Sequence, residues 1–424
     1  MSLFLCPECD LLQKSGPLAA GSAVHCSRCG YLLHRARANS LDRSLALTLA
    51  GLVLFAIANS FPFLSFQMQG QTTETTLSTG ISSLFDQGKW EVALVVLFTS
   101  ILAPGLQLLL LASVLLPLKG GRFPPWLAQL FRLFRHLLPW GMMDVFLIGI
   151  LVSVVKLTEM ASIVPGISLF AFVLLIFVLA AAQSSLDPDI VWSRVALRAP
   201  VRLRLRPGET ALGCESCDLV VPKPALREAG LKDACPRCAS ALHRRKPRSL
   251  QRTWALVIAA LLFYIPANVF PIMTVTSLGN AQSDTILSGV VFLLHHGMWP
   301  LALVVFVASI FVPLLKLVIL VFLLVSVQLR LRWRPVDRTR LYRLTEAIGR
   351  WSMVDVYVVT ILVALVHLGN LASIQAETGA VFFCAVVIIT MLAAMAFDPR
   401  LIWDALGEQE TRVAQNPTAE LAHP

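Results

Sequence analysis

Eight of the nine cysteines fall in four C-x2-C pairs, a spacing at which thiols bind metal ions. The pairs form two modules, the first made by Cys6, Cys9, Cys26 and Cys29 and the second by Cys214, Cys217, Cys235 and Cys238. Sixteen residues separate the pairs of the first module and 17 those of the second, as in a four-thiolate zinc ribbon. We therefore predict two structural zinc sites, since four thiolates leave the metal no open position for catalysis.

Two other interpretations of the cysteine modules stay open at this point. Iron suits the same four thiolates, and C-x2-C pairs also occur as redox-active thiols. No βαβ pattern surrounds either pair, which weighs against redox chemistry. Each module has roughly 40 residues, too few for a core that folds without a metal. Cys384 lies alone in an apolar run, where we expect ordinary helix packing.

Polar residues inside apolar runs are the second chemical feature. Gln107 and Lys316 each follow a proline by three residues, Pro104 and Pro313, at matching places in the chain. Proline removes a backbone hydrogen bond, and matched interruptions of two membrane segments indicate a transport site. We predict that Lys316 belongs to a functional polar network; the alternative is a lysine that is simply paired or reaches the membrane surface.

Further ionisable residues lie in the third apolar segment of each half. Asp144 and Asp355 stand near its start, where pairing with arginines such as Arg135 or Arg350 is the plainer interpretation.

Lys156 and Glu159 lie three residues apart on one helical face and can form an ion pair. Their counterparts in the second half are His367 and Asn370, so the halves are chemically different. Proton relay and a structural salt bridge both fit the charged pair.

These residues belong to a sequence pattern that occurs twice in the chain. With an offset of 209, Asn59-Ser-Phe-Pro62 returns as Asn268-Val-Phe-Pro271, and Gly88-Lys-Trp90 returns as Gly297-Met-Trp299. With an offset of 211, Trp140, Met142 and Asp144 return as Trp351, Met353 and Asp355. A register kept over this length indicates a duplicated domain.

The composition indicates a polytopic membrane protein. The chain is 57% hydrophobic and 14% charged, against about 25% charged in soluble domains. Runs without charge recur at 44–67, 92–118, 145–155, 160–186, 253–283, 300–315, 356–366 and 380–397. We predict a mainly α fold of eight membrane-spanning helices, four in each half. Because four is even, both halves enter from the same side and form a tandem parallel repeat.

The positions of lysine and arginine predict the orientation. The short segments after the first, third, fifth and seventh spans hold only Lys89 and Lys156, whereas arginine concentrates in 122–135, 194–252 and 330–350. Both termini and both cysteine modules are therefore expected in the cytoplasm, where disulfides are disfavoured. The net charge of +10 reflects this topology, with attraction to lipid headgroups; nucleic-acid binding is the weaker explanation.

These observations divide the chain into six parts. We expect zinc ribbons at 1–38 and 209–246, four-helix membrane bundles at 39–192 and 247–407, a basic linker at 193–208 and a flexible tail at 408–424. The chain lacks a P-loop, a G-x-S-x-G sequence, an H-E-x-x-H sequence and a dinucleotide-binding fingerprint. We therefore expect no enzymatic activity.

The duplicated order of these motifs resembles that of the bacterial paraquat-inducible protein A family, which includes PqiA and LetA. The resemblance covers about Cys6 to Trp403 and rests on the C-x2-C pairs, N-x-F-P, Gly-x-Trp and W-x-M-x-D. It implies a protein of the Gram-negative inner membrane that works with MCE-domain proteins, which form tunnels across the periplasm, and moves phospholipid between membranes. The replacement of Lys156 and Glu159 in the second half implies that the halves do different work.

Three functional hypotheses follow. The first is a lipid carrier that loads or unloads a periplasmic tunnel and supports envelope integrity. The second is a scaffold that anchors the tunnel without moving lipid, and the third is a proton-coupled transporter of small molecules.

Overall fold

The computed structural model describes residues 2–16, 18–19, 21–68, 71–157, 162–206, 209–231, 233–277, 280–295, 297–366 and 372–406. Within these residues, eight helical segments are long and apolar enough to cross a membrane, which confirms the predicted number. Four belong to each half of the chain. Most of their helices are apolar around the whole circumference, but α5 (Leu127–Leu137) has one basic face and α14 (Pro335–Gly349) is rich in charged residues.

The spans of the first half are partly composite. The first and fourth spans are single helices, whereas the second and third are each built from two helices joined by a short irregular turn. In order they are α1 (Ser40–Ser60); α3 (Trp90–Leu97), the π-turn η1 (Phe98–Leu102) and α4 (Ala103–Lys119); α5 (Leu127–Leu137), the 3-10 turn η2 (Leu138–Trp140) and α6 (Met143–Leu157); and α7 (Ile167–Ser185). The short helix α8 (Pro188–Arg194) follows.

The second half repeats this pattern. In order its spans are α10 (Ser249–Val269); α12 (Trp299–Phe306), the π-turn η3 (Val307–Phe311) and α13 (Val312–Gln328); α14 (Pro335–Gly349), the 3-10 turn η4 (Arg350–Met353) and α15 (Val354–Leu365); and α16 (Thr378–Ala396). Both π-turns end just before the matched prolines Pro104 and Pro313. Since proline offers no N–H, the helix changes its hydrogen-bond register there. In the first half the Thr99 carbonyl oxygen accepts a hydrogen bond from the Met142 N–H at 3.4 Å.

The cysteine modules contain short antiparallel hairpins. The first is built from β1 (Ser2–Leu5) with β2 (Leu12–Ser15) and β3 (Ala23–His25) with β4 (Leu32–Arg35). The second has β8 (Ala211–Gly213) with β9 (Val220–Pro222), followed by α9 (Lys223–Glu228). Strand β1 contacts β8 and β9, so the two modules lie against each other.

At the other end of the molecule each half carries a three-stranded antiparallel sheet, a feature absent from the sequence expectations. The sheets have the orders β6-β5-β7 and β11-β10-β12. Their strands are β5 (Leu64–Met68), β6 (Gln71–Thr75) and β7 (Ser162–Pro165), and β10 (Met273–Ser277), β11 (Asn280–Asp284) and β12 (Ala372–Ala376). A short helix follows the strand β6 or β11 of each sheet: α2 (Thr79–Asp86) in the first half and α11 (Ile286–His295) in the second.

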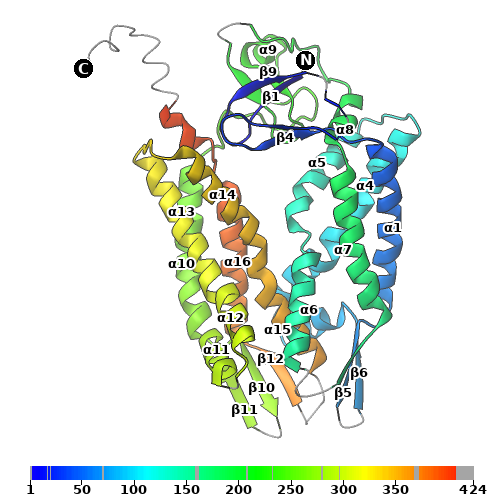
Figure 1. Cartoon of the computed structure of the whole chain (residues 1–424), viewed down its shortest axis with the longest axis vertical. Coiled ribbons are helices and arrows are strands. Elements are labelled where there is room, and N and C mark those ends of the chain that lie inside the picture. The colour runs from blue at the N-terminus through cyan, green and yellow to red at the C-terminus, as the bar shows by residue number, and fades with distance from the viewer. Residues whose placement is uncertain are drawn as a thin grey trace.

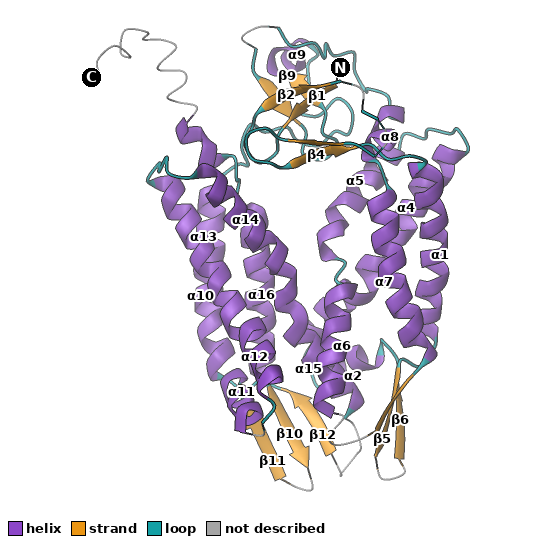
Figure 2. Cartoon of the chain, viewed as in Figure 1, coloured by secondary structure: helices purple, strands orange, loops and turns teal. Residues whose placement is uncertain are grey.

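The two halves point the same way, which confirms the parallel repeat. Both cysteine modules lie at one end, here named the module end, and both sheets lie at the other, the strand end (Figure 1). The bundles diverge toward the module end and meet near the strand end, where α6 contacts α15 (Figure 2). Gly149 permits the contact, because a Cβ there would lie 2.9 Å from the Cβ of Tyr357.

Candidate functional site

The four thiols of each cysteine module converge on one point. In the first module, Cys6 Sγ lies 3.5 Å from Cys29 Sγ and Cys9 Sγ lies 3.4 Å from Cys26 Sγ. In the second, the equivalent pairs Cys214–Cys238 and Cys217–Cys235 lie at 3.4 and 3.5 Å. All eight cysteines are buried and free of disulfides.

Tight turns of the backbone direct the thiols toward this point. The residue after each pair, Asp10, Gly30, Asp218 or Ala239, has a positive φ, the left-handed conformation that a metal-binding knuckle needs. A tetrahedral ion with bonds of about 2.3 Å separates its sulfurs by about 3.8 Å. Within each module all four sulfurs lie within 4.8 Å of one another, so each group fits a closed tetrahedral metal ion.

The modules are crossed between the halves. The cysteines of the first module share a buried core with Leu320 and Tyr342, which belong to the second bundle. The cysteines of the second module share a core with Leu115 and Phe131 of the first bundle. Each four-cysteine cluster therefore packs on the bundle of the other half.

Arginines of the third spans hold the crossed modules. Arg343 in α14 forms an ion pair with Glu8 and donates a hydrogen bond to the Cys29 carbonyl oxygen at 3.0 Å. Burial raises the pKa of the Glu8 carboxyl above its ordinary value, although Arg343 acts in the opposite direction. In α5, Arg132 donates to the Cys238 carbonyl oxygen at 3.4 Å.

Arg135 in α5 donates to the Ser216 carbonyl oxygen at 2.6 Å and to the Asp218 carboxylate at 2.9 Å. This arginine thus pairs with the second module and not with Asp144, the partner that sequence reasoning considered. Asp144 is exposed at the start of α6, and Asp355 is half-buried at the start of α15.

Gln107 lies where the third span of the first half is interrupted. Its side chain is 1% exposed and donates a hydrogen bond to the carbonyl oxygen of Leu137, the last residue of α5, at 2.7 Å. It accepts one from Gln183 of α7 at 3.2 Å. The amide therefore satisfies a carbonyl that the helix break leaves open.

Lys316 lies at the equivalent place in the second half. Its side chain is 1% exposed, and its Nζ donates to Thr390 Oγ1 of α16 at 2.9 Å. Within the described part of the chain no carboxylate forms an ion pair with it. Gly349 at the end of α14 leaves the ammonium group open on one side, since a Cβ there would lie 3.9 Å from Nζ.

A pocket of about 420 Å³ opens beside this glycine. It is lined by Gly349 with residues of α14, η4 and α16 and by Pro139 of the first half, so both halves contribute to it. Arg343, Glu346 and Arg350 supply its charged wall, and Met391 and Met395 supply its apolar wall. The pocket combines charged surface of both signs with apolar surface, next to a buried lysine.

The remaining predicted polar residues cannot be placed in this arrangement. Lys156 belongs to α6, but its side chain lies outside the described residues, as do Glu159, His367 and Asn370. The residues that sequence reasoning missed are the arginines of the crossed contacts. Arg132 and Arg343 are 211 positions apart, the offset of Trp140 and Trp351, and this repeat equivalence was the available signal.

Two parallel four-helix bundles, each associated with a four-cysteine cluster that can hold a metal ion, define a duplicated multi-pass membrane protein. The bundles match the family model for paraquat-inducible protein A over residues 41–196 and 250–407. The chain belongs to the paraquat-inducible protein A family.

Relatives in other bacteria extend over nearly the whole chain. It is 36% identical to the intermembrane transport protein PqiA of Escherichia coli strain K12, over 96% of both chains. It is 31% identical to the lipophilic envelope-spanning tunnel protein A of the same organism, over 94% of this chain and 91% of the relative. A probable intermembrane transport protein of Haemophilus influenzae is 28% identical, over 94% and 95%. No solved structure matches the chain.

Proposed function

We propose that this chain is the inner-membrane component of an intermembrane phospholipid transport system and exchanges lipid with a periplasm-spanning MCE-domain partner. The names of the relatives, an intermembrane transport protein and an envelope-spanning tunnel protein, support transport between membranes. The observation that carries the lipid assignment is the pocket beside Gly349. Its arginines suit a phosphate headgroup and its methionines suit acyl chains.

In this proposal Arg350 binds the phosphate, and the uncompensated charge of Lys316 adds a second cation behind Gly349, while Arg343 stays paired with Glu8. A buried ammonium group in a membrane is unfavourable by about 3 kcal/mol or more, so an arriving anion is attracted to it. The lipid then passes along the interface between the bundles to a partner docked at the strand end. Lys156, Glu159, His367 and Asn370 would carry the headgroup, or the protons that drive release.

The orientation and the metal belong to the same proposal. The module end faces the cytoplasm, as the arginine-rich segments indicate, and each module holds one structural zinc ion. Reduced thiols and closed four-sulfur geometry support zinc over redox chemistry. No step of lipid transfer uses the metal; its part is to hold each module folded against the opposite bundle. The names of the relatives agree with a transporter that lacks enzymatic activity.

The lipid assignment is tested by filling the pocket. Ala347 lines it and is exposed, so Ala347→Trp fills space without disturbing a core. Leu174→Trp adds the same ring to the exposed surface of α7 and serves as the matched control. The measurement is mass spectrometry of lipids that copurify with the full chain, with and without the periplasmic partner.

We expect Ala347→Trp to reduce copurified phospholipid and lipid transfer to the partner, whereas Leu174→Trp retains both. Equal lipid content and transfer in the two variants would reject a lipid pocket at this place. If Ala347→Trp retains both copurified phospholipid and lipid transfer and still binds the partner, a scaffold would be favoured. Lipid-independent flux of protons with a small solute would favour the third hypothesis.

Lys316→Gln supplies a second test, because glutamine is the residue that the first half carries at this position. We expect it to preserve folding and to reduce transfer of anionic lipid by about tenfold, as loss of one charged contact predicts. Unchanged transfer would remove Lys316 from the mechanism.

A further inference from the structure

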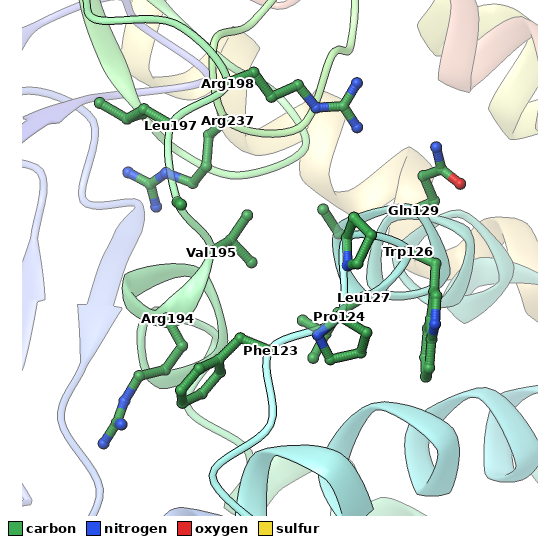
Figure 3. A pocket seen from close by; sticks show the side chains of 13 residues that line it. Phe123, Pro124, Trp126, Leu127, Gln129, Arg194, Val195, Leu197, Arg198 and Arg237 are labelled. Atoms are coloured by element: carbon green, nitrogen blue, oxygen red, sulfur yellow. The ribbon is translucent and has the colours of Figure 1, made fainter.

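A second pocket of about 600 Å³ lies at the module end of the first bundle, away from the pocket beside Gly349. One wall is the loop between the second and third spans, with Phe123 and Trp126 (Figure 3). The opposite wall is the end of α8 and the following linker, with Arg194 and Arg198. Arg237 comes from the second cysteine module (Figure 3).

Three cations from three separate segments thus surround one concave surface. Among the described residues, none of the three arginines has a carboxylate oxygen within 4.0 Å, whereas the nearby Arg135 is paired with Asp218. The acid on α8, Asp189, is paired with His34. Asp189 also lies close enough to Arg237 to interact with it electrostatically. Arg194 and Arg198, which have no ion pair among the described residues, therefore supply most of the charge available to an anion from outside the protein.

A backbone hydrogen bond and a cation–π contact hold these arginines in place. The Arg198 N–H donates a hydrogen bond to the Pro236 carbonyl oxygen at 2.8 Å, which ties the linker to the cysteine turn that carries Arg237. The Arg194 guanidinium lies 5.5 Å from the centre of the Phe123 ring, in a cation–π contact. Arg198 extends over the pocket toward Gln129 (Figure 3).

The loop wall of the pocket joins two candidate membrane spans. The second span ends at Lys119 and the third begins at Leu127, so we infer that this loop lies near the lipid headgroups. Phe123 and Trp126 are 47% and 43% exposed there, and half-exposed aromatic side chains are typical of the membrane interface. A free anion needs no such apolar wall; a phospholipid does.

The equivalent surface of the second half lacks this property. Arg334 and Asp337 stand at the positions of Phe123 and Trp126, and the Asp337 carboxylate lies 3.7 Å from Arg334 and 3.4 Å from Arg340. The pocket on that surface therefore contains an acid among its arginines. The lining of the first-half pocket contains three arginines and no acid.

We propose that this pocket binds the phosphate headgroup of an anionic phospholipid of the adjacent leaflet. Arg194, Arg198 and Arg237 bind the phosphoryl oxygens, and Phe123 and Trp126 contact the glycerol and upper acyl region. The site is separate from the pocket beside Gly349 and does not depend on lipid transfer. Inorganic phosphate shares the headgroup chemistry, and the experiment below separates the two.

The experiment is native mass spectrometry of the full, metal-loaded chain with added phosphatidylglycerol, phosphatidylcholine or inorganic phosphate. The triple variant Arg194→Gln, Arg198→Gln, Arg237→Gln is compared with the control Arg334→Gln, Arg340→Gln, which removes two arginines at the same depth. Because Arg237 lies between two cysteines, Arg194→Gln, Arg198→Gln is measured as well, and metal content is verified for each.

We expect wild type and control to prefer phosphatidylglycerol over phosphatidylcholine. Affinity should fall by about tenfold or more in the triple variant and by about fivefold in the double variant, as removal of charges near a membrane surface predicts. Any of three results would overturn the proposal. They are unchanged phosphatidylglycerol binding in the triple variant, an equal loss in the control, and phosphate or phosphatidylcholine binding as tight as that of phosphatidylglycerol.

Discussion

Arg132 and Arg343 occupy equivalent positions in the two halves, and each donates a hydrogen bond to the carbonyl oxygen of the last cysteine in the other half's module. The two contacts are equivalent by the internal repeat, although their donor–acceptor distances differ, 3.4 Å for Arg132 and 3.0 Å for Arg343. The exchange of modules between bundles couples the halves at the module end. The α6–α15 contact couples them near the strand end.

The two arginines should differ in their contribution to stability. Arg343 also pairs with the buried Glu8 carboxylate, so Arg343→Gln leaves a charge unpaired and should lower the free energy of unfolding by about 2–3 kcal/mol. Arg132→Gln loses only a long bond to a neutral acceptor and should lower it by about 0.5–1 kcal/mol. Denaturation of the solubilised chain measures both.

Adding Glu8→Gln to Arg343→Gln removes the unpaired charge and should restore part of the loss. If the two single arginine variants were equally stable, or the double variant were less stable than Arg343→Gln, the Glu8 pair would not be the source of the difference.

Loss of one metal should loosen the opposite bundle. Cys235→Ser removes one thiolate of the second module and should lower the metal content from two ions to one per chain, measured by elemental analysis. Because this module packs on the first bundle, hydrogen exchange should rise in α5 and not in α14. Cys26→Ser should show the reverse, with exchange rising in α14. Increased exchange in the bundle of the same half would contradict the crossed arrangement.

Two matched glycines should tolerate no side chain. A Cβ on Gly166 would overlap the Pro62 carbonyl oxygen, and one on Gly379 would overlap that of Pro271. Since the obstructing atoms are backbone, Gly166→Ala and Gly379→Ala should each lower the free energy of unfolding by about 2 kcal/mol or more. Gly289→Ala is the control, because its surroundings are open and alanine favours a helix by about 1 kcal/mol. Equal yields and unfolding curves for all three variants would refute the close approach.

The periodic features of this fold could be predicted from the sequence. The eight spans follow from runs without charge such as 92–118, and the parallel repeat follows from the even number of spans per half. The four-thiol clusters follow from the C-x2-C spacing. These properties depend on local composition or on a regular offset, so a single sequence contains them.

Features that depend on which surfaces meet could not be predicted. The strands β5 and β10 alternate apolar and polar residues, but each has only five residues and lies close behind a membrane span, so the sheets were missed. Nothing local to Cys29 or Cys238 indicates that its module packs on the other half's bundle. Lys316 and Gln107 were predicted as intramembrane polar residues, but their contacts with Thr390 and with the Leu137 carbonyl depend on helix packing.

The last prediction concerns the interface of the two bundles. The Tyr357 hydroxyl of α15 donates to Thr99 Oγ1 of η1 at 2.7 Å, and both residues are buried. Tyr357→Phe removes the donor and keeps the ring, so it should lower the free energy of unfolding by about 0.5–1 kcal/mol.

Thr99→Val removes the acceptor, and a double-mutant cycle should give a coupling energy of about 0.5 kcal/mol or more between the two positions. Tyr264→Phe is the control, because that hydroxyl bonds to the Ile310 carbonyl oxygen within one bundle and should not couple to Thr99. Additive effects of Tyr357→Phe and Thr99→Val would contradict the bond. A cycle that couples as expected identifies this hydrogen bond as a contact that holds the two bundles together near the strand end.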